Sequence, residues 1–456
     1  MYNTSLHFHF TGIGGSGMSG IAEILLRMGY QVSGSDLRIN SACHHLEELG
    51  ASIAEGHCPE NIPEQASLLV YSSAVKEDNV ELVEARRRGL PVIPRAAVLA
   101  ELMRLKFGIA VAGSHGKTTT TTMIGELLER AAFDPTVIIG GQVKSIGSGG
   151  KLGAGSFLVA ESDESDRSFL MLKPTIAVVT NIDAEHLVAY GSLSELEKSF
   201  EQFVNSVPFY GMAVLCYDDA RVRDLIKRFS GRKLTYGLSP AADISAVSIE
   251  STGRGIACNV LYRGRPFCSL DLPVPGKHML LNALAAVSVG IELGIGAEII
   301  SQALADFSGV RRRLDNLGTV GGVTIFDDYG HHPTEIKCTI AAIRQWKEGT
   351  LKKLHVVFQP HRYSRTRECF AEFLDAFNGV DVLYVTDIYP AGENPIEGIS
   401  SAKLVEALNH HDVTYTPSLQ DALDAVRERV QCGDTVLCLG AGSINSLAER
   451  LMKELK

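Results

Sequence analysis

One short stretch limits the fold of this chain more than any other. Residues 109–122 read IAVAGSHGKTTTTT, which is an apolar strand, a glycine turn, a Lys-Thr pair and a helix, in that order. Such a unit surrounds a phosphate group with backbone N–H groups and a lysine, and it is typical of parallel sheets covered by helices. The usual longer loop has a glycine where this chain has Val111. We therefore predict an α/β fold with a variant phosphate-binding loop.

The composition narrows the class of protein further. The chain has 456 residues, enough for two or three domains, and its 45% hydrophobic content allows large cores. The net charge of −10 argues against nucleic acid or a membrane surface as a partner. Nine cysteines without a C-x-x-C pair indicate free thiols in a reducing compartment. With no signal peptide and no apolar run of spanning length, we expect a soluble cytoplasmic protein.

Strand-like runs alternate with helix-like segments along the whole chain, which predicts mostly parallel sheets. We place the domain boundaries near residues 106 and 313. The prediction is an α/β protein of three domains: a Rossmann-like domain at 1–106, a central ATP-binding domain with a mostly parallel sheet at 107–313, and a Rossmann-like domain at 314–456.

A second glycine turn lies near the N-terminus, in TGIGGSGMSG between a strand and a helix. Gly12, Gly14, Gly15 and Gly17 allow a sharp turn that brings the backbone close to a diphosphate, and Asp36 ends the next strand, where an acid can bind a ribose. Taken alone, this pattern favours NAD. Its spacing is not a regular G-x-G-x-x-G, so a tight turn without ligand and the diphosphate of another nucleotide remain open.

The loop at 113–118 has a clearer chemistry. Gly113 and Gly116 form the turn, Lys117 supplies a charge for the phosphates, and the Thr118 hydroxyl is a ligand for Mg²⁺. The best carboxylate for the same ion is Glu161, which ends the strand SFLVAE.

Other polar residues follow Glu161 and the next strand. Asp163, Glu164 and Asp166 include solvated acids and helix caps, as acidic runs usually do. His186 follows the strand TIAVVTNIDAE, and its place at a strand end beside a triphosphate favours a metal ligand over a structural histidine.

The last third of the chain carries two dense polar clusters at strand ends. They comprise Asp327, Asp328, Tyr329, His331 and His332, and then Gln359, His361, Arg362, Tyr363, Ser364 and Arg365. Together they predict a binding wall for an anionic substrate. At the joint before them, Arg312 or Arg313 could neutralise a γ-phosphate during phosphoryl transfer, whereas Arg311 reads as a solvated basic residue.

These motifs occur together in a known order. GSHGKTTTT, AESDESD, TNIDAEH, GKHMLLNALAA, RRRLD, DDYGHHPTEI and QPHRYSRT closely resemble the bacterial Mur ligases over essentially the whole chain. The variant loop is the form that this family carries. The resemblance implies an ATP-dependent carboxylate–amine ligase that joins L-alanine to UDP-N-acetylmuramate through an acyl phosphate, in peptidoglycan precursor synthesis. It implies ATP and Mg²⁺, with two metal sites and Mn²⁺ as a substitute.

The resemblance also assigns residues. For ATP it implies Gly113, Ser114, His115, Gly116, Lys117, Thr118, Thr119, His278, Asn282 and Arg313. For the metals it implies Thr118 and Glu161 at one ion and His186 at the second. The catalytic group is Lys117, Glu161, His186, Arg313 and Asp328. For UDP-N-acetylmuramate and L-alanine it implies Gly12, Gly14, Gly15, Ser16, Gly17, Met18, Ser35, Asp36, Ser72, Ser73, Tyr329, His331, His361, Arg362 and Arg365.

The chain departs from the family at one position: Val188 stands where an aspartate usually follows the metal histidine. The carbamylated lysine of related ligases has no convincing match, although Lys198 lies near. Either Asp328 or His331 is a candidate to assist deprotonation of the alanine amine. The partners implied are the two substrates alone, with a monomer or weak homodimer.

Three alternatives have to be separated from this reading. The nearest is the recycling ligase, which adds a ready-made tripeptide to UDP-N-acetylmuramate; QPHRYSRT favours the L-alanine reaction. An NAD-dependent oxidoreductase explains TGIGGSGMSG and Asp36 but leaves GSHGKT, Glu161 and His186 unexplained. A binding protein without catalysis would be expected to lack Lys117 or Glu161, and both are present.

Overall fold

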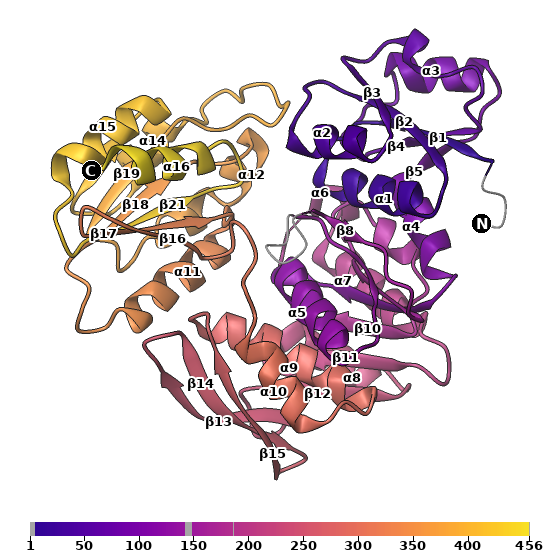
Figure 1. Cartoon of the computed structure of the whole chain (residues 1–456). Coiled ribbons are helices and arrows are strands. Elements are labelled where there is room, and N and C mark those ends of the chain that lie inside the picture. Colours follow the sequence, from indigo (N-terminus) through magenta and orange to yellow (C-terminus); the bar gives the residue numbers. More distant parts are fainter. Residues whose placement is uncertain (1–4, 142–147, 186, 456) are drawn as a thin grey trace. The chain divides into compact units, whose positions relative to one another are not determined.

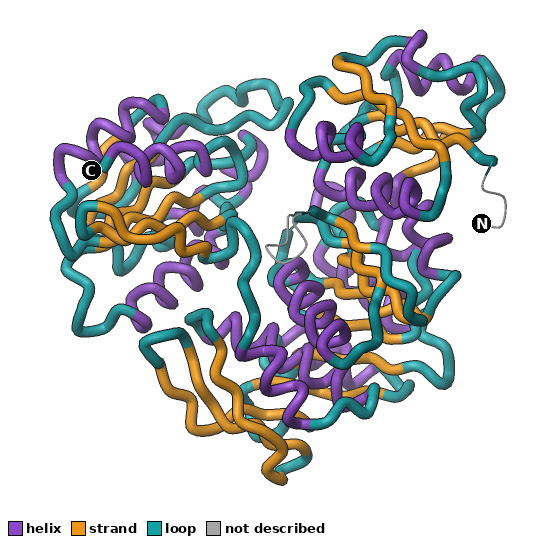
Figure 2. The backbone as a smooth tube through the Cα atoms, viewed as in Figure 1, coloured by secondary structure: helices purple, strands orange, loops and turns teal. Residues whose placement is uncertain are grey.

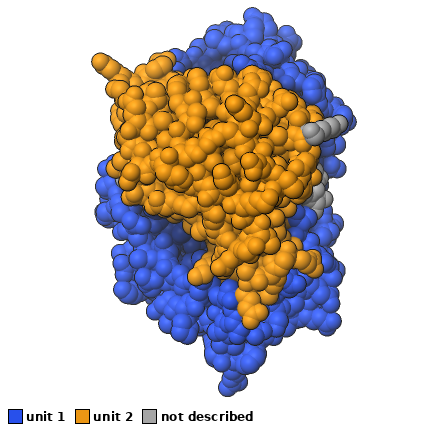
Figure 3. All heavy atoms as spheres, turned by 90° about the vertical axis from the view of Figure 1, so that its left-hand side faces the viewer, with its two compact units in different colours: residues 1–249, 258–271, 281–308 blue, residues 250–257, 272–280, 309–456 orange. Residues whose placement is uncertain are grey.

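The computed structural model describes residues 5–141, 148–185 and 187–455. The chain divides into two compact units, coloured in Figure 3: residues 1–249, 258–271 and 281–308 form unit 1, and residues 250–257, 272–280 and 309–456 form unit 2. Three sheets with flanking helices make it a three-domain α/β protein, as expected (Figures 1 and 2). In the described ranges, none of the helices has both the length and the apolar character that a membrane crossing requires.

The first sheet has five parallel strands in the order β3-β2-β1-β4-β5. The strands are β1 His7–Thr11, β2 Gln31–Asp36, β3 Ser52–Glu55, β4 Leu68–Tyr71 and β5 Val92–Pro94. The helices are α1 Ser16–Arg27, α2 Ser41–Glu48, the 3-10 helix η1 Pro59–Asn61, α3 Val80–Arg87 and α4 Arg95–Met103. The chain order reverses at β1, whose neighbours are β2 and β4. Such a switch point is where open α/β sheets bind ligands, and the glycine turn follows β1 there.

The second sheet has ten strands in the order β15-β14-β13-β12-β11-β10-β6-β9-β7-β8. The strands are β6 Phe107–Ala112, β7 Thr136–Ile138, β8 Gly150–Lys151, β9 Phe157–Glu161, β10 Ile176–Val179, β11 Met212–Cys216, β12 Lys233–Gly237, β13 Ile244–Ser251, β14 Ile256–Tyr262 and β15 Arg265–Leu272. The helices are α5 Lys117–Arg130, the 3-10 helix η2 Ser168–Met171, α6 Leu187–Tyr190, α7 Leu193–Asn205, α8 Ala220–Arg228, α9 Lys277–Glu292 and α10 Ala297–Ala305. Strand β6 lies between β10 and β9, parallel to both.

Helix α5 forms although threonines are poor helix formers. All five threonines at 118–122 are buried, and the hydroxyls of Thr121 and Thr122 donate to the carbonyls of Lys117 and Thr118, at 2.9 and 2.8 Å. These bonds satisfy polar groups that burial would otherwise leave unpaired. Packing in the domain, rather than intrinsic propensity, therefore holds this helix.

Helix α1 packs directly on the second sheet, within unit 1. A Cβ atom on Gly20 would lie 2.6 Å from the carbonyl oxygen of Gly149, next to β8. Only a glycine permits this approach of two backbones. The glycine turn before α1 is thereby fixed against the domain that carries the phosphate loop.

The third sheet lies in unit 2, with six strands in the order β16-β17-β21-β18-β19-β20. The strands are β16 Asp315–Val320, β17 Val323–Asp328, β18 Leu354–Phe358, β19 Val382–Val385, β20 Val413–Tyr415 and β21 Thr435–Leu439. The helices are α11 Pro333–Trp346, α12 Tyr363–Glu368, α13 Phe370–Phe373, α14 Ser401–Ala407, α15 Leu419–Arg429 and α16 Asn445–Glu454. Alternate residues of the central strands pack into two apolar clusters, one with α11 and one with α15 and α16. The sheet is therefore buried on both faces, as parallel strands require.

Two features differ from a simple alternation of strands and helices. The pairs β7–β8 and β16–β17 are antiparallel. In addition, β13, β14 and β15 follow one another without an intervening helix. Residues 244–272 alternate polar and apolar side chains, which is the pattern of strands with one wet face.

Candidate functional site

The first glycine turn is closed by strand β2. The amides of Gly12 and Ile13 both donate to the carbonyl of Ser35, at 2.8 and 3.0 Å. The amide of Gly14 donates to a carboxylate oxygen of Asp36 at 2.9 Å. Gly12 adopts φ +81°, which favours glycine. Asp36 thus shapes the turn itself, in addition to the ligand-binding role predicted from the sequence.

The serines predicted to bind substrate differ in their surroundings. Ser72 follows β4 beside the turn, and its Cβ is 3.6 Å from the position of a Cβ on Gly12. Ser73 is its neighbour. Ser35, in contrast, is fully buried, and its hydroxyl donates to Glu81 at 2.6 Å. The side chain of Ser35 therefore belongs to the interior of the first domain.

The phosphate loop begins at Gly113, after the end of strand β6, whereas the position of the missing glycine, Val111, lies within that strand. Val111 is buried within β6 and pairs with Val178 and Glu161 on the two neighbouring strands. The turn starts at Gly113, with φ +139°, and closes at Gly116, with φ +81°, directly before α5. A glycine is not needed at 111 because that residue is still part of the strand.

The end of strand β10 fixes the loop. The amide of Ser114 donates to the carbonyl of Asn181 at 3.1 Å, and the amide of His115 donates to the side-chain oxygen of the same residue at 2.9 Å. The Thr180 hydroxyl donates to the carbonyl of His115 at 2.6 Å, and the imidazole of His115 lies 3.2 Å from Asp183. These contacts hold the loop in shape before any phosphate binds.

Lys117 lies inside the loop rather than in solvent. Its ammonium donates to the carbonyls of Gly113 and Ser114, at 2.7 and 3.1 Å, and pairs with Glu164 at 2.8 Å. Burial alone would lower the pKa of Lys117, but the carboxylates of Glu164, Glu161 and Asp163 outweigh it and raise the pKa. Lys117 therefore stays charged, as a phosphate-binding lysine must.

The residues predicted to hold the first Mg²⁺ lie together. The Thr118 hydroxyl donates to one carboxylate oxygen of Glu161 at 3.2 Å, and the other oxygen accepts from the amide of Gly140 at 2.9 Å. A hydroxyl and a carboxylate, side by side at the start of α5, are the hard oxygen ligands that Mg²⁺ prefers. His186, predicted for the second ion, lies outside the described residues.

Two of the residues predicted to bind ATP lie on helix α9, one in each unit. Asn282, in unit 1, is buried, and its side-chain oxygen is 2.5 Å from the position of a Cβ on Gly116. It therefore borders the phosphate loop. His278, in unit 2, has its pKa lowered to about 4, mainly by burial and then by the charge of Arg313. It is a neutral imidazole at physiological pH.

The joint before β16 holds two arginines against one aromatic ring. The guanidinium carbons of Arg312 and Arg313 lie 4.9 and 5.1 Å from the ring centre of Tyr329. Arg312 donates to the carbonyls of Gly440 and Gly442, at 2.5 and 3.2 Å. Arg312 is thus held by short hydrogen bonds to its own domain, whereas Arg313 pairs with Glu335 of α11 at the longer distance of 3.5 Å, so Arg313 is the better candidate for a phosphate.

Asp328 anchors this joint. One of its carboxylate oxygens accepts from the amide of Leu314 at 2.6 Å, and the other accepts from the amide of Gly330 at 2.8 Å. Burial raises its pKa. With both oxygens occupied, the geometry favours a role in positioning Arg313 over one in proton transfer.

The binding wall predicted from QPHRYSRT and DDYGHHPTEI is assembled in unit 2. The rings of His331 and His361 are 5.7 Å apart, and Arg365 donates to Nδ1 of His361 at 3.2 Å. Burial and the nearby arginines lower the pKa of His361 to about 4, and burial lowers the pKa of His331 well below its usual value. The wall therefore combines fixed positive charge with two neutral imidazoles.

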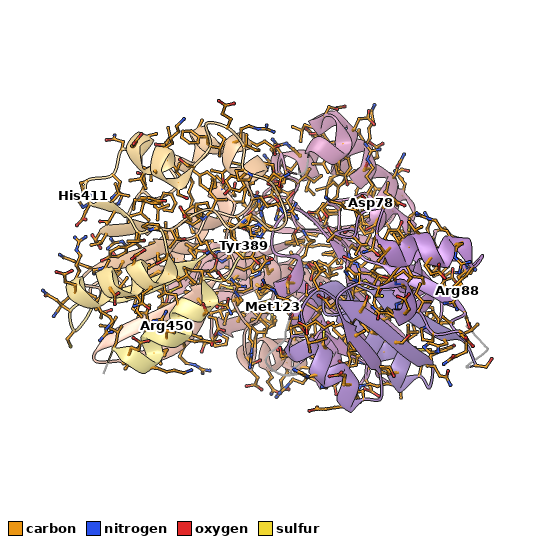
Figure 4. All side chains as sticks on the ribbon, turned by 90° about the horizontal axis from the view of Figure 1, so that it is seen from above. Asp78, Arg88, Met123, Tyr389, His411 and Arg450 are labelled. Carbon is orange, nitrogen blue, oxygen red and sulfur yellow. The ribbon has the colours of Figure 1, made fainter. Side chains whose placement is uncertain are left out.

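Sequence reasoning missed two contributors. The sequence places Glu164 in an acidic run without distinguishing it, yet it is the ion-pair partner of Lys117. Tyr389, labelled in Figure 4, stacks on His361 with ring centres 5.7 Å apart and planes 7° apart. Its position after a buried strand, in DVLYVTDIYPAGE, was the available signal.

Three family models match consecutive parts of the chain. They are the Mur ligase family catalytic domain at residues 7–107, the Mur ligase middle domain at residues 111–290, and the Mur ligase glutamate ligase domain at residues 312–442.

Curated proteins and solved structures agree with these matches. The UDP-N-acetylmuramate–L-alanine ligase of Geotalea daltonii is 50% identical over 459 residues, covering 100% of this chain and 99% of the relative. That of Geobacter sulfurreducens is 49% identical over 461 residues, with coverage of 100% and 99%. The crystal structure of UDP-N-acetylmuramate–alanine ligase MurC from Thermotoga maritima has a TM-score of 0.85 at 28% identity, covering 98% of both chains. A murein peptide ligase from Psychrobacter arcticus shares the fold, with a TM-score of 0.73 at 22% identity and 99% coverage of both chains. The chain belongs to the Mur ligase family.

Proposed function

We propose that this protein is an ATP-dependent ligase that joins L-alanine to the carboxylate of UDP-N-acetylmuramate, giving the amide, ADP and phosphate. The observation that carries the proposal is the loop in which Lys117, Thr118 and Glu161 surround the start of α5. The full-length similarity to curated UDP-N-acetylmuramate–L-alanine ligases supports the choice of substrates. Peptidoglycan precursor synthesis in the cytoplasm is the corresponding cellular role.

The chemistry explains why such a loop is needed. A carboxylate is a poor electrophile, and transfer of the γ-phosphoryl group of ATP gives it a good leaving group. The amine of alanine then attacks the acyl phosphate, and the tetrahedral intermediate collapses to amide and phosphate. The end of strand β10 holds the loop in shape in advance, and Lys117 already lies inside it, so stabilising the developing charge requires little change beyond an exchange of partners by Lys117.

Mg²⁺ fits the oxygen donors of Thr118 and Glu161 and would reduce the repulsion between the carboxylate and the triphosphate. A second ion on His186 stays a prediction. Its ligand geometry is not among the described residues.

The two glycine turns would then serve two different nucleotides. The turn after β1 would bind the diphosphate of the UDP-sugar, and the loop after β6 would bind ATP. This division predicts that Lys117→Ala abolishes turnover while UDP-N-acetylmuramate still binds with nearly unchanged affinity. Equal loss of both properties would contradict separate sites.

The wall in unit 2 suits the remaining groups of the substrates. Arg362 and Arg365 supply positive charge for carboxylates, and neutral His331 is the candidate to take the proton that the alanine ammonium group must lose before its amine attacks. Asp328 is less suited to this step because its oxygens already accept hydrogen bonds.

The experiment that tests the proposal is phosphate release from ATP in the presence of UDP-N-acetylmuramate, with L-alanine compared with L-Ala-γ-D-Glu-meso-diaminopimelate. Release with L-alanine supports the proposed reaction. Release with the tripeptide alone would assign the chain to the recycling reaction instead. The same assay without either amine gives the background of ATP hydrolysis.

A further inference from the structure

Arg95 is the first residue of α4, and its side chain lies against the first turn of α1. A Cβ atom on Gly17 would be 2.2 Å from a terminal nitrogen of Arg95 and 2.9 Å from its guanidinium carbon. Any larger residue at 17 would displace the guanidinium. Gly17 is therefore required for the position of Arg95, and not only for the course of the turn.

The same turn of α1 presents unused donors. Helix α1 has no side-chain cap at Gly15 and no acidic residue in its first turn. The amides of Met18 and Ser19 donate to the carbonyl of Gly15, whereas those of Ser16 and Gly17 donate no hydrogen bond to any described residue. Two free N–H groups at the positive end of a helix, with a guanidinium beside them, form an arrangement suited to a diphosphate.

In this structure Arg95 forms an ion pair with a carboxylate. Its terminal nitrogen is 3.3 Å from a carboxylate oxygen of Asp163, in the acidic stretch that follows β9. The pair is partly shielded, with Arg95 18% exposed and Asp163 36% exposed. The other oxygen of Asp163 accepts from the amide of Ser165 at 3.0 Å, so the carboxylate keeps one bond if the arginine leaves.

We propose that Arg95 is a ligand of the UDP-sugar diphosphate and that Asp163 competes with the diphosphate for its guanidinium. Arg95 exchanges the carboxylate for the phosphates when the UDP-sugar binds at the turn before α1. The inference rests on the proposed function, because it requires a UDP-sugar at that turn. It adds Arg95 as a positively charged ligand of the diphosphate and Asp163 as a carboxylate that opposes UDP-sugar binding.

If Asp163 competes with the diphosphate, substitutions of Arg95 and of Asp163 should change the affinity for the UDP-sugar in opposite directions. Arg95→Ala should weaken UDP and UDP-N-acetylmuramate binding at least tenfold, and Arg95→Lys should weaken it less, because a lysine keeps the charge but not the planar pair of donors. Asp163→Asn should strengthen binding several-fold, since it removes the competitor. In the Arg95→Ala background, Asp163→Asn should have almost no effect.

Calorimetric titration of each purified full-length variant with UDP and with UDP-N-acetylmuramate measures these affinities. Arg104→Ala is the matched control, because Arg104 caps the other end of α4 and pairs on the surface with Glu101 at 3.0 Å. Thermal unfolding of every variant establishes that it is folded. If Arg95→Ala does not fold, the affinity gain of Asp163→Asn and the intermediate affinity of Arg95→Lys still test the proposal.

The outcomes separate the inference from the proposed function. Weaker binding in both Arg95→Ala and Asp163→Asn would mean that the pair only joins two domains, which overturns the proposal. Unchanged binding in Arg95→Ala would also overturn it, although the ligase reaction would stand. Failure of the unmodified protein to bind UDP-N-acetylmuramate would contradict the proposed function itself.

Discussion

Lys117 and Glu164 form an ion pair at 2.8 Å in which the lysine side chain is 15% exposed and the glutamate 2%. The other hydrogen bonds of the ammonium go to carbonyls of its own loop. An ammonium has three donors, so all of them are used before ATP arrives. Lys117 must therefore exchange partners to reach a phosphate, and Glu164 is the charged partner that it would leave.

Glu164→Gln should strengthen nucleotide binding and weaken the fold. Burial raises the pKa of Glu164 to about 7, against the opposing effect of Lys117, so the comparison belongs at pH 8, where the carboxylate is ionised. Removing its charge relieves the burial penalty on Glu164, but it also leaves the buried ammonium of Lys117 without its ion-pair partner. Because the second effect is the larger, we expect a loss of about 1–3 kcal/mol in unfolding free energy. ADP, titrated without metal, should bind several-fold more tightly.

Glu101→Gln is the control for this substitution, because Glu101 makes an exposed ion pair on α4. It should change neither property. Weaker ADP binding in Glu164→Gln at unchanged stability would show that Glu164 supports the nucleotide instead of competing with it.

Gly116→Ala should abolish ATP binding through two separable costs. Gly116 adopts φ +81°, and its added Cβ would lie 2.5 Å from the side-chain oxygen of Asn282. Gly29→Ala provides the matched control, since Gly29 has φ +87° with no atom within 4 Å of the added Cβ. Backbone strain alone costs about 1–2 kcal/mol of unfolding free energy. The additional loss of unfolding free energy in Gly116→Ala, compared with Gly29→Ala, therefore measures the clash with Asn282.

Combining Gly116→Ala with Asn282→Ala should recover the part of the stability that the clash removes. ATP binding should not return, because the loop amides are displaced and the Asn282 amide is gone. Equal stability losses for Gly29→Ala and Gly116→Ala, from urea unfolding, would rule out a close contact with Asn282.

The sequence predicted the strand, turn and helix around Lys117 because glycine spacing and apolar periodicity are local properties. It did not predict which acid of ESDESD contacts the lysine. That choice depends on the path of the loop between β9 and η2, where Asp163 pairs with Arg95 and Glu164 with Lys117. A sequence lists these carboxylates without the distances that distinguish them.

The structural surroundings of Ser35 and of residues 244–272 also depend on the fold and could not be predicted from local motifs. Ser35 is next to Asp36 in the chain, but successive side chains of a strand point to opposite faces, and that of Ser35 is buried against Glu81. The three strands at 244–272 have no glycine-rich loop or catalytic motif, and they are not among the strands expected from the sequence; their weak polar alternation is the signal that they offer. Motifs thus predicted the candidate site, whereas long-range packing decides which of its groups contact one another.

Glu81 should make stability depend on pH in the acid range. It is fully buried, which alone would raise its pKa, but the His9 imidazole at 3.6 Å and hydrogen bonds from Ser35, Asn61 and Thr11 outweigh burial and lower the pKa to about 2. A carboxyl whose folded pKa is below its unfolded value of 4.5 stabilises the fold above pH 4.5, and this contribution is lost as the pH falls toward 2. The shift corresponds to about 3 kcal/mol at neutral pH.

Urea unfolding of the unmodified protein and of Glu81→Gln at pH 7, 4.5 and 3 measures this contribution. The difference between the two should be largest at pH 7 and should shrink below pH 4.5. Glu55→Gln, at an exposed position on β3, is the control and should show no such trend. A difference that is constant with pH would mean that the side-chain hydrogen bonds, and not the charge of Glu81, supply the stability.

Asp328→Asn and Asp327→Asn should change stability in opposite directions although the residues are neighbours in β17. The two oxygens of Asp328 accept amides, so an asparagine would turn its NH₂ group toward a donor, at a cost of about 1–3 kcal/mol. One oxygen of Asp327 has no hydrogen-bond partner among the described residues. Burial raises the pKa of Asp327 to about 7, against the opposing charge of Arg312.

A carboxyl whose folded pKa lies above its unfolded value of 3.8 destabilises the fold as it ionises, so the penalty grows from pH 3.8 and is complete above about pH 7. Asp327→Asn removes the penalty and should raise the unfolding free energy at pH 8.5 relative to the unmodified protein, with a smaller gain at pH 5. Asp328→Asn should lower the unfolding free energy at both values, because the amides of Leu314 and Gly330 lose a charged acceptor. Stabilisation by Asp328→Asn at pH 8.5 would show instead that its buried charge outweighs the two amide hydrogen bonds.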